Sequence, residues 1–172
     1  LVLPWDQVDE SICAKPLEWS GKTLGRFMRF FGPISSVFDI ITFAYLFFIL
    51  CPAVCGGTFA SLSGSGEQAR FIILFQTGWF LESMWTQVLI LHLLRTQKVP
   101  LLQSRPSRPV MVVTLLGTAV FTLLTFTPMG EWIGLTALPP VYFVFLAVTV
   151  FFYLLWVTLA KRWYIRRYHE LL

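Results

Sequence analysis

Charged residues are scarce in this sequence. Only 13% of its 172 residues are Asp, Glu, Lys or Arg, whereas 56% are hydrophobic and 17% are aromatic. Soluble domains carry about 25% charged residues, so this composition excludes an ordinary soluble domain. The three cysteines are also too few for a disulfide framework. The fold must therefore be stabilised by apolar packing in an apolar surrounding.

Motifs for nucleotide, hydrolytic or nucleic-acid chemistry are missing as well. The sequence contains no Gly-rich phosphate loop, no His-Glu-x-x-His pair and no recognisable Ser-His-Asp set. Its basic residues do not form a patch with base-stacking aromatics, which argues against a nucleic-acid partner. We therefore expect no catalytic residue and no bound cofactor in this segment.

Positive charge is distributed very unevenly along the chain. Twelve of the thirteen Lys and Arg residues flank the same side of the apolar runs, and one lies on the other side. Cytoplasmic loops of membrane proteins retain Lys and Arg, so both termini and the middle loop are predicted to be cytoplasmic. The cytoplasmic set is Lys15, Lys22, Arg26, Arg29, Arg95, Lys98, Arg105, Arg108, Lys161, Arg162, Arg166 and Arg167; the exception is Arg70.

Apolar runs long enough to cross a bilayer follow one another through the chain. A hydrocarbon core of about 30 Å requires roughly 20 helical residues. The sequence thus predicts an all-α membrane protein with four transmembrane helices in an antiparallel bundle. The predicted spans are residues 34–54, 71–94, 110–126 and 141–160.

The first 32 residues differ in character from the remaining 33–172. They are more polar, and Leu24, Phe27 and Phe31 recur at helical spacing beside basic residues, a pattern typical of an interfacial helix. We expect residues 1–32 to form a cytoplasmic and interfacial strap, and 33–172 to form the four-span domain. Pro33 is expected in the first turn of the first span, where proline is tolerated.

Two polar residues of the second predicted span are the strongest candidates for function. Glu82 lies near its middle, where an ionisable group costs several kcal/mol unless it is paired or hydrated. Gln87 lies about 140° away from Glu82 around the helix. Both are candidate metal or ion-pathway ligands. A buried carboxyl group that fixes a neighbouring helix remains the alternative for Glu82.

A second polar face is expected in the first predicted span. Ser35, Asp39 and Thr42 fall within about 60° of one another at 100° per residue. This face is interpreted mainly as structural polarity that bonds a neighbouring helix. Pairing of Asp39 with Arg26 or Arg29 is the other structural possibility.

Several segments resemble the bacterial magnesium-transporting P-type ATPases. The resemblance covers nearly the whole chain, and its longest run is the most specific. The segments are 15–19, 24–39, 74–80, 91–100, 138–143 and the basic tail 166–168.

This resemblance implies a particular part of the pump. It corresponds to the C-terminal region, with the loop after the sixth transmembrane helix followed by helices seven to ten. In that family ATP phosphorylates an Asp in an Asp-Lys-Thr-Gly motif, and ions bind mainly among helices four to six. None of these parts lies in this sequence, so the ATP and Mg²⁺ used by the parent pump would bind elsewhere. Helix eight adds polar ligands in some relatives; Gln87 falls near such a position, and Glu82 is offset from it by several residues.

The resemblance favours a membrane support domain of an ATP-driven pump that imports magnesium. Its expected partners are the lipid bilayer and the remaining helices and cytoplasmic domains of the pump, and its expected location is the bacterial inner membrane. Two alternatives remain at this stage. One is a stand-alone four-helix membrane protein, such as an accessory subunit or small channel. The other is the same region of a P-type pump for calcium or another cation.

Overall fold

The computed structural model describes residues 21–94 and 108–168, and in this part of the chain the regular secondary structure consists of helices, without a strand. The predicted all-α class is thereby confirmed. In chain order the helices are α2 (Gly21–Tyr45), η1 (Leu46–Leu50), α3 (Cys51–Cys55), α4 (Ser65–Leu94), α5 (Arg108–Leu124), α6 (Pro128–Trp132) and α7 (Pro140–Tyr168). The predicted strap before Gly21 and most of the basic middle loop lie outside the described residues.

The first helical segment runs without interruption from Gly21 to Cys55. Pro33 lies inside α2 and does not begin it, so the expectation of a helix start at Pro33 is wrong. The reason is packing: Phe27 and Phe31 upstream of the proline contact Tyr164, with ring centroids 6.2 and 5.5 Å apart. Burial of these aromatic rings holds the helix together across the proline.

A π-helical stretch, η1, separates α2 from α3. Pro52 lies at the start of α3, and a proline removes one intrahelical donor and clashes with the carbonyl of the preceding turn. A local π-helix widens that turn and relieves the clash. Gly56 then ends the segment with a φ of 82°, a left-handed conformation that glycine adopts without steric cost.

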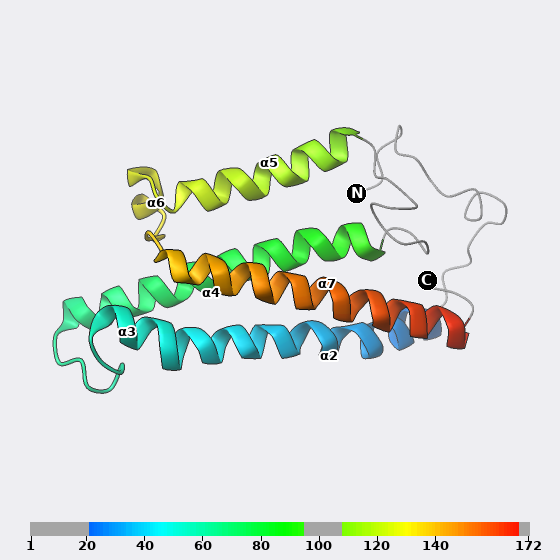
Figure 1. Ribbon diagram of the computed structural model, residues 1–172, viewed down its shortest axis with the longest axis horizontal. Helices are drawn as coiled ribbons and strands as arrows, with labels where there is room; N and C mark the ends of the chain where they lie inside the picture. Colours follow the sequence, from blue (N-terminus) through cyan, green and yellow to red (C-terminus); the bar gives the residue numbers. More distant parts are fainter. Residues whose placement is uncertain (1–20, 95–107, 169–172) are drawn as a thin grey trace.

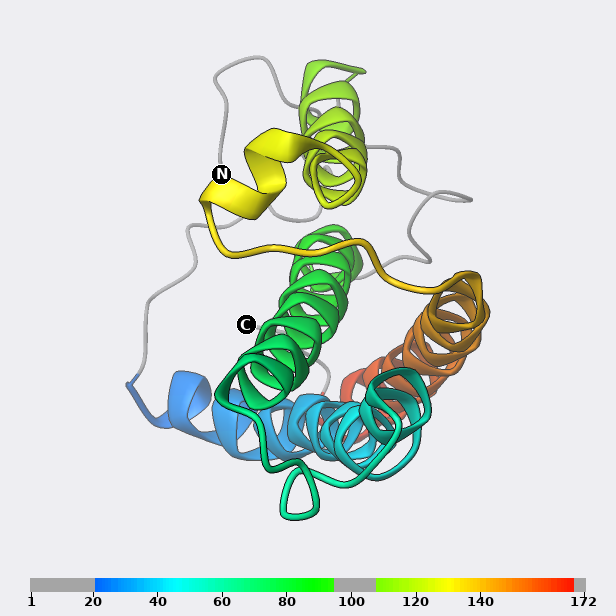
Figure 2. The same ribbon diagram turned by 90° about the vertical axis from the view of Figure 1, so that its left-hand side faces the viewer.

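Three long helices, α2, α4 and α7, pack side by side, each contacting the other two. The shorter α5 packs against one side of α4 and lies away from α2 (Figures 1 and 2). Two interhelical hydrogen bonds join α5 to α4: Trp85 Nε1 donates to Thr122 Oγ1 at 3.2 Å, and His92 Nε2 lies 2.9 Å from Thr114 Oγ1. Such bonds are a common means of association between helices in membranes.

Length and composition identify two segments that can cross a membrane in the described part of the chain, Gly21–Cys55 and Pro140–Tyr168. The helix Arg108–Leu124 is apolar but shorter. Helix α4 is 30 residues long and contains the polar residues Glu82 and Gln87. Helical residues overlap each predicted span, and the helical segments begin or end up to thirteen residues from the predicted limits.

The interior of the three-helix bundle contains two separate apolar clusters. The first includes Leu46, Leu50, Leu81 and Tyr142, towards the α3 end of the bundle. The second includes Phe31, Phe38, Leu93, Tyr153, Val157 and Tyr164, towards the end formed by the C-terminus of α4. Residues between the two clusters are polar, and they form the candidate site.

Lys161 joins α7 to the C-terminus of α4. Its side chain is 3% exposed, and its Nζ donates to the carbonyl oxygen of Leu93 at 2.7 Å. Carbonyl groups in the last helical turn have no partner within the helix, and a cation there also interacts favourably with the helix dipole.

Replacing Lys161 with Met is expected to lower the stability of the full-length protein. A hydrogen bond to a charged group contributes about 1.5–3 kcal/mol, and the Leu93 carbonyl would lose this donor. Thermal unfolding in detergent measures the effect. The neighbouring, exposed Arg162 provides the matched control, because Arg162→Met removes a charge and leaves this bond in place. Equal melting temperatures for the two variants would contradict the assignment.

Candidate functional site: a buried polar layer

Glu82 is the most deeply buried of the Asp, Glu, Lys and Arg residues that the structure describes. It lies in the middle of α4, its side chain is 0% exposed, and neither carboxyl oxygen has a hydrogen-bond partner within residues 21–94 and 108–168. No basic side chain forms an ion pair with it among the described residues. A carboxyl group in such surroundings is costly, which makes it the natural centre of a candidate site.

Hydroxyl groups from all three long helices lie in the same layer as Glu82. Thr42 of α2 is fully buried, and Tyr153 of α7 is 1% exposed; among the described residues the Thr42 hydroxyl has no hydrogen-bond partner. Thr86 follows Glu82 by one turn on α4, and its hydroxyl donates to the Glu82 backbone carbonyl at 3.0 Å. Thr149 on α7 is also buried. The layer therefore combines one carboxyl group with hydroxyls contributed by three helices.

Asp39 of α2 adds a second carboxyl group at the edge of this layer. It is half-buried and close enough to Glu82 for their charges to interact. The predicted pairing of Asp39 with Arg26 or Arg29 is not seen among the described residues; Arg26 instead stacks over the ring of Tyr168, 4.7 Å from its centroid. Among the described residues, neither carboxyl group forms an ion pair with a basic side chain.

A close helix crossing lies directly above the layer. Gly78 of α4 contacts Leu46 so tightly that a Cβ atom at Gly78 would lie 2.7 Å from a Leu46 methyl carbon. The Tyr142 hydroxyl of α7 donates to the Gly78 carbonyl at 2.5 Å. Small residues allow membrane helices to approach in this way, so Gly78 sets the position of α4 relative to α2 and α7, and with it the position of Glu82.

The residues predicted from the sequence are separated by the fold. Glu82 and Thr42 are buried in the bundle, and Ser35 and Asp39 are half-buried on α2, whereas Gln87 is exposed on the outer side of α4. Glu82 and Gln87 therefore do not lie on one surface of this chain. An ion that contacts Gln87 would approach from outside the three-helix bundle.

Three buried polar residues of α7 were missed from the sequence: Tyr142 and Tyr153 near the layer, and Lys161 at the C-terminus of α4. All lie on one stripe of α7, whose buried residues recur every three or four positions: Tyr142, Leu146, Thr149, Tyr153, Val157, Lys161 and Tyr164. The signal that could have found them is residue type. The interior stripe contains the tyrosines, whereas Phe151 and Phe152 are exposed.

The chemistry available to this layer is limited to oxygen ligation and hydrogen bonding. A hard divalent cation takes six or more oxygen ligands or retains several waters. The described residues contain no group of three His, Cys, Asp or Glu that could hold a metal ion. Cys51 and Cys55 are free thiols. Glu82 can thus be one ligand of an ion, but it does not complete a cation site with the described residues alone.

Long apolar helices that pack closely at a glycine, as in the described part of the chain, are typical of an integral membrane protein. Residues 1–163 match the family described as "Cation transporting ATPase, C-terminus", and the chain belongs to this family.

Among curated proteins, the chain is similar to "Magnesium-transporting ATPase, P-type 1" of Salmonella typhimurium, with 40% identity over 99% of the chain. It is also similar to the Escherichia coli protein of the same name, with 37% identity over 98% of the chain. The chain spans 17% of the length of these relatives. The resemblance seen in the sequence is therefore confirmed.

Proposed function

We propose that this chain is the membrane support domain of an ATP-driven P-type pump that imports magnesium into the cytoplasm. The observation that carries the proposal is the 40% identity that extends over 99% of the chain to a magnesium-transporting relative. In this role, helices α2, α4 and α7 hold the ion-binding helices of the pump in place. ATP and the Mg²⁺ that accompanies it act on other parts of the parent protein.

The proposed topology has four membrane spans with both termini in the cytoplasm of a bacterial cell, at its inner membrane. The twelve-to-one distribution of Lys and Arg supports this orientation. Residues 1–32 form the strap between helices six and seven of the pump, and 33–172 form the four-span domain. Lipid and the remaining helices of the pump are the partners.

Glu82 and Gln87 are proposed as polar groups of the ion pathway. Glu82 contributes a buried carboxyl group between α2, α4 and α7, whereas Gln87 presents its amide on the opposite side of α4. Asp39, Ser35 and Thr42 are proposed as structural polar groups that maintain the contact of α2 with the bundle.

The sequence upstream of Leu1 in the same reading frame tests the assignment to a pump. An Asp-Lys-Thr-Gly segment several hundred residues before Leu1 is the expected result, because a P-type pump needs this aspartate for phosphorylation. An initiator methionine directly before Leu1 would contradict the proposal and favour a stand-alone four-helix membrane protein.

A further inference from the structure

The side chain of Glu82 has no hydrogen bond of its own to hold it. Neither of its carboxyl oxygens has a partner among the described residues, so its place in the bundle depends on the turn of α4 that carries it. This turn begins at Gly78, because in an α-helix the carbonyl of residue i accepts from the N–H of residue i+4. A contact that fixes Gly78 therefore also fixes the backbone of Glu82.

Tyr142 of α7 makes such a contact. Its side chain is fully buried, and its hydroxyl donates to the Gly78 carbonyl oxygen at 2.5 Å. The same hydroxyl lies beside the backbone amide of Glu82. The Gly78 carbonyl thus serves two donors, the backbone N–H of its own helix and the phenol of α7. A single side chain of α7 thereby reaches both ends of the turn.

A second hydrogen bond reaches this turn from the segment that leads into α7. The backbone N–H of Thr136 donates to the hydroxyl of Thr77 at 3.1 Å, and that hydroxyl donates to the carbonyl of Ile73 at 2.7 Å. Figure 2 shows this connection between α6 and α7 crossing α4. Thr77 directly precedes Gly78, so two hydrogen bonds from the C-terminal part of the chain hold neighbouring residues of α4.

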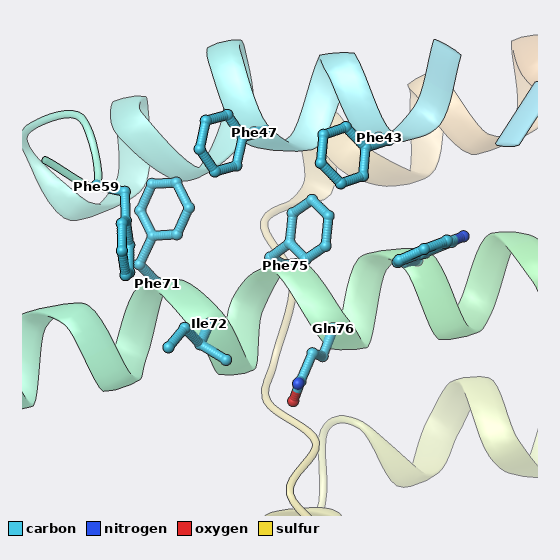
Figure 3. A pocket seen from close by; sticks show the side chains of 8 residues that line it. Phe43, Phe47, Phe59, Phe71, Ile72, Phe75 and Gln76 are labelled. Atoms are coloured by element: carbon cyan, nitrogen blue, oxygen red, sulfur yellow. The ribbon is translucent and has the colours of Figure 1, made fainter. Parts of the chain in front are cut away.

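The side of α4 that faces the first helical segment has contacts of another kind. There Phe43 and Phe47 point towards Phe71 and Phe75 of α4 (Figure 3), and the ring centroids of Phe43 and Phe75 are 5.0 Å apart. Burial of apolar surface is non-directional, so these rings constrain the rotation of α4 less than hydrogen bonds do. The directional contacts of this turn come from the α7 side.

We propose that Tyr142 is a positioning residue for ion binding, which acts through Gly78 to place the Glu82 carboxyl group in the ion pathway. This inference rests on the proposed function, because it requires the role of Glu82 in that pathway. Tyr142 itself does not contact the ion, since the one hydrogen of its hydroxyl is donated to Gly78. Its loss should therefore weaken ion binding and leave the maximal rate unchanged.

Tyr142→Phe in the full-length pump tests this role. The change removes only the hydroxyl, and the Gly78 carbonyl keeps its helical donor. Magnesium uptake is measured in sealed vesicles that contain ATP, at increasing concentrations of magnesium outside. The concentration that gives half-maximal uptake should rise about two- to tenfold, the factor that corresponds to the net contribution of one neutral hydrogen bond.

Tyr164→Phe is the matched control. Tyr164 is also fully buried on α7, but it belongs to the apolar cluster at the other end of the bundle. Its substitution removes a buried hydroxyl far from Gly78 and should leave the half-saturating concentration of magnesium unchanged. No rise for Tyr142→Phe, or an equal rise for both variants, would overturn the proposal.

A double variant separates positioning from a general loss of packing. If Tyr142 acts through Glu82, adding Tyr142→Phe to Glu82→Gln should not raise the half-saturating concentration further. Effects that add would show two independent sites and would overturn the proposal.

The same measurements distinguish this proposal from the proposed function. If Glu82→Gln alone leaves the ion dependence unchanged, the role of Glu82 in the ion pathway is refuted, and positioning by Tyr142 with it. If Glu82→Gln has its effect and Tyr142→Phe has none, positioning alone is refuted. The same coupling observed in the uptake of another cation would refute the magnesium assignment and support the role of Tyr142.

Thr77→Val keeps the proposal testable if the Tyr142→Phe pump does not fold. Val has nearly the shape of Thr but lacks the hydroxyl that accepts from Thr136, so the second bond to this turn is lost. The half-saturating concentration of magnesium should again rise. A lower thermal unfolding temperature with an unchanged half-saturating concentration would contradict positioning of Glu82 from the α7 side.

Discussion

Changing Glu82 to Gln in the full-length pump is expected to raise the ion concentration needed for half-maximal ATPase activity by at least about tenfold. Losing even an outer contact of a metal site costs 10–100-fold in affinity, and Glu82 would be a direct ligand. Gln keeps the shape of the side chain and one carbonyl oxygen, but it removes the negative charge. The effect is therefore on the ion, and the packing of the bundle is largely preserved.

The control for this prediction is Glu67→Gln. Glu67 lies on the same helix but in its first turn, where its side chain is exposed. Its substitution should leave the ion dependence of ATP hydrolysis unchanged. If Glu82→Gln left the ion dependence unchanged and lowered only the thermal stability, Glu82 would be a structural carboxyl group and its ligand role would be refuted.

Replacing Gly78 with Val is expected to destabilise the membrane domain by about 1–3 kcal/mol, the usual cost of overpacking a filled interior. A Cβ atom at this position would lie 2.7 Å and 3.1 Å from the two methyl carbons of Leu46, and 3.3 Å from a ring carbon of Tyr142. Leu46 is fully buried, so its side chain has little free space into which to turn. Thermal unfolding of the full-length pump in detergent measures the loss.

A compensating substitution makes this prediction specific. Leu46→Ala removes the methyl groups that clash, so the double variant Gly78→Val with Leu46→Ala should recover part of the lost stability. Two changes that share no contact would instead add. Additive losses in the double variant would show that the close approach of Gly78 and Leu46 does not limit the packing.

Some of the bundle could be predicted from the sequence because polar residues in apolar helices carry more information than apolar ones. Glu82 was selected for its cost in a membrane, and its complete burial in the structure agrees with that reasoning. The expected angular separation of Glu82 and Gln87 also agrees with one residue being buried and the other exposed. The functional role assigned to either residue stays a prediction.

The interior of α7 could not be predicted in the same way. Membrane helices are apolar on their outer side as well as inside, so hydrophobic periodicity does not distinguish the two. The helix contains aromatic residues on every side, and only their type separates Tyr153 inside from Phe152 outside. Long-range contacts set the rest, such as the bond of Lys161 to Leu93 over a separation of 68 residues.

The start of the first helix shows a local rule being overridden by packing. Proline usually marks a first helical turn, which placed the start at Pro33. The aromatic contacts of Phe27, Phe30 and Phe31 with Tyr164 lie upstream of this proline, and α2 begins at Gly21. A single sequence does not reveal that these residues meet the far end of the chain.

Uptake of magnesium by the full-length protein, measured in sealed vesicles with ATP and compared with uptake of calcium under the same conditions, is the most direct test of the proposed function. ATP-dependent transport of magnesium towards the side that hydrolyses ATP, with no comparable transport of calcium, is the expected result. ATP-dependent transport of calcium without magnesium, or magnesium movement in the opposite direction, would contradict the assignment of this chain to a magnesium-importing pump.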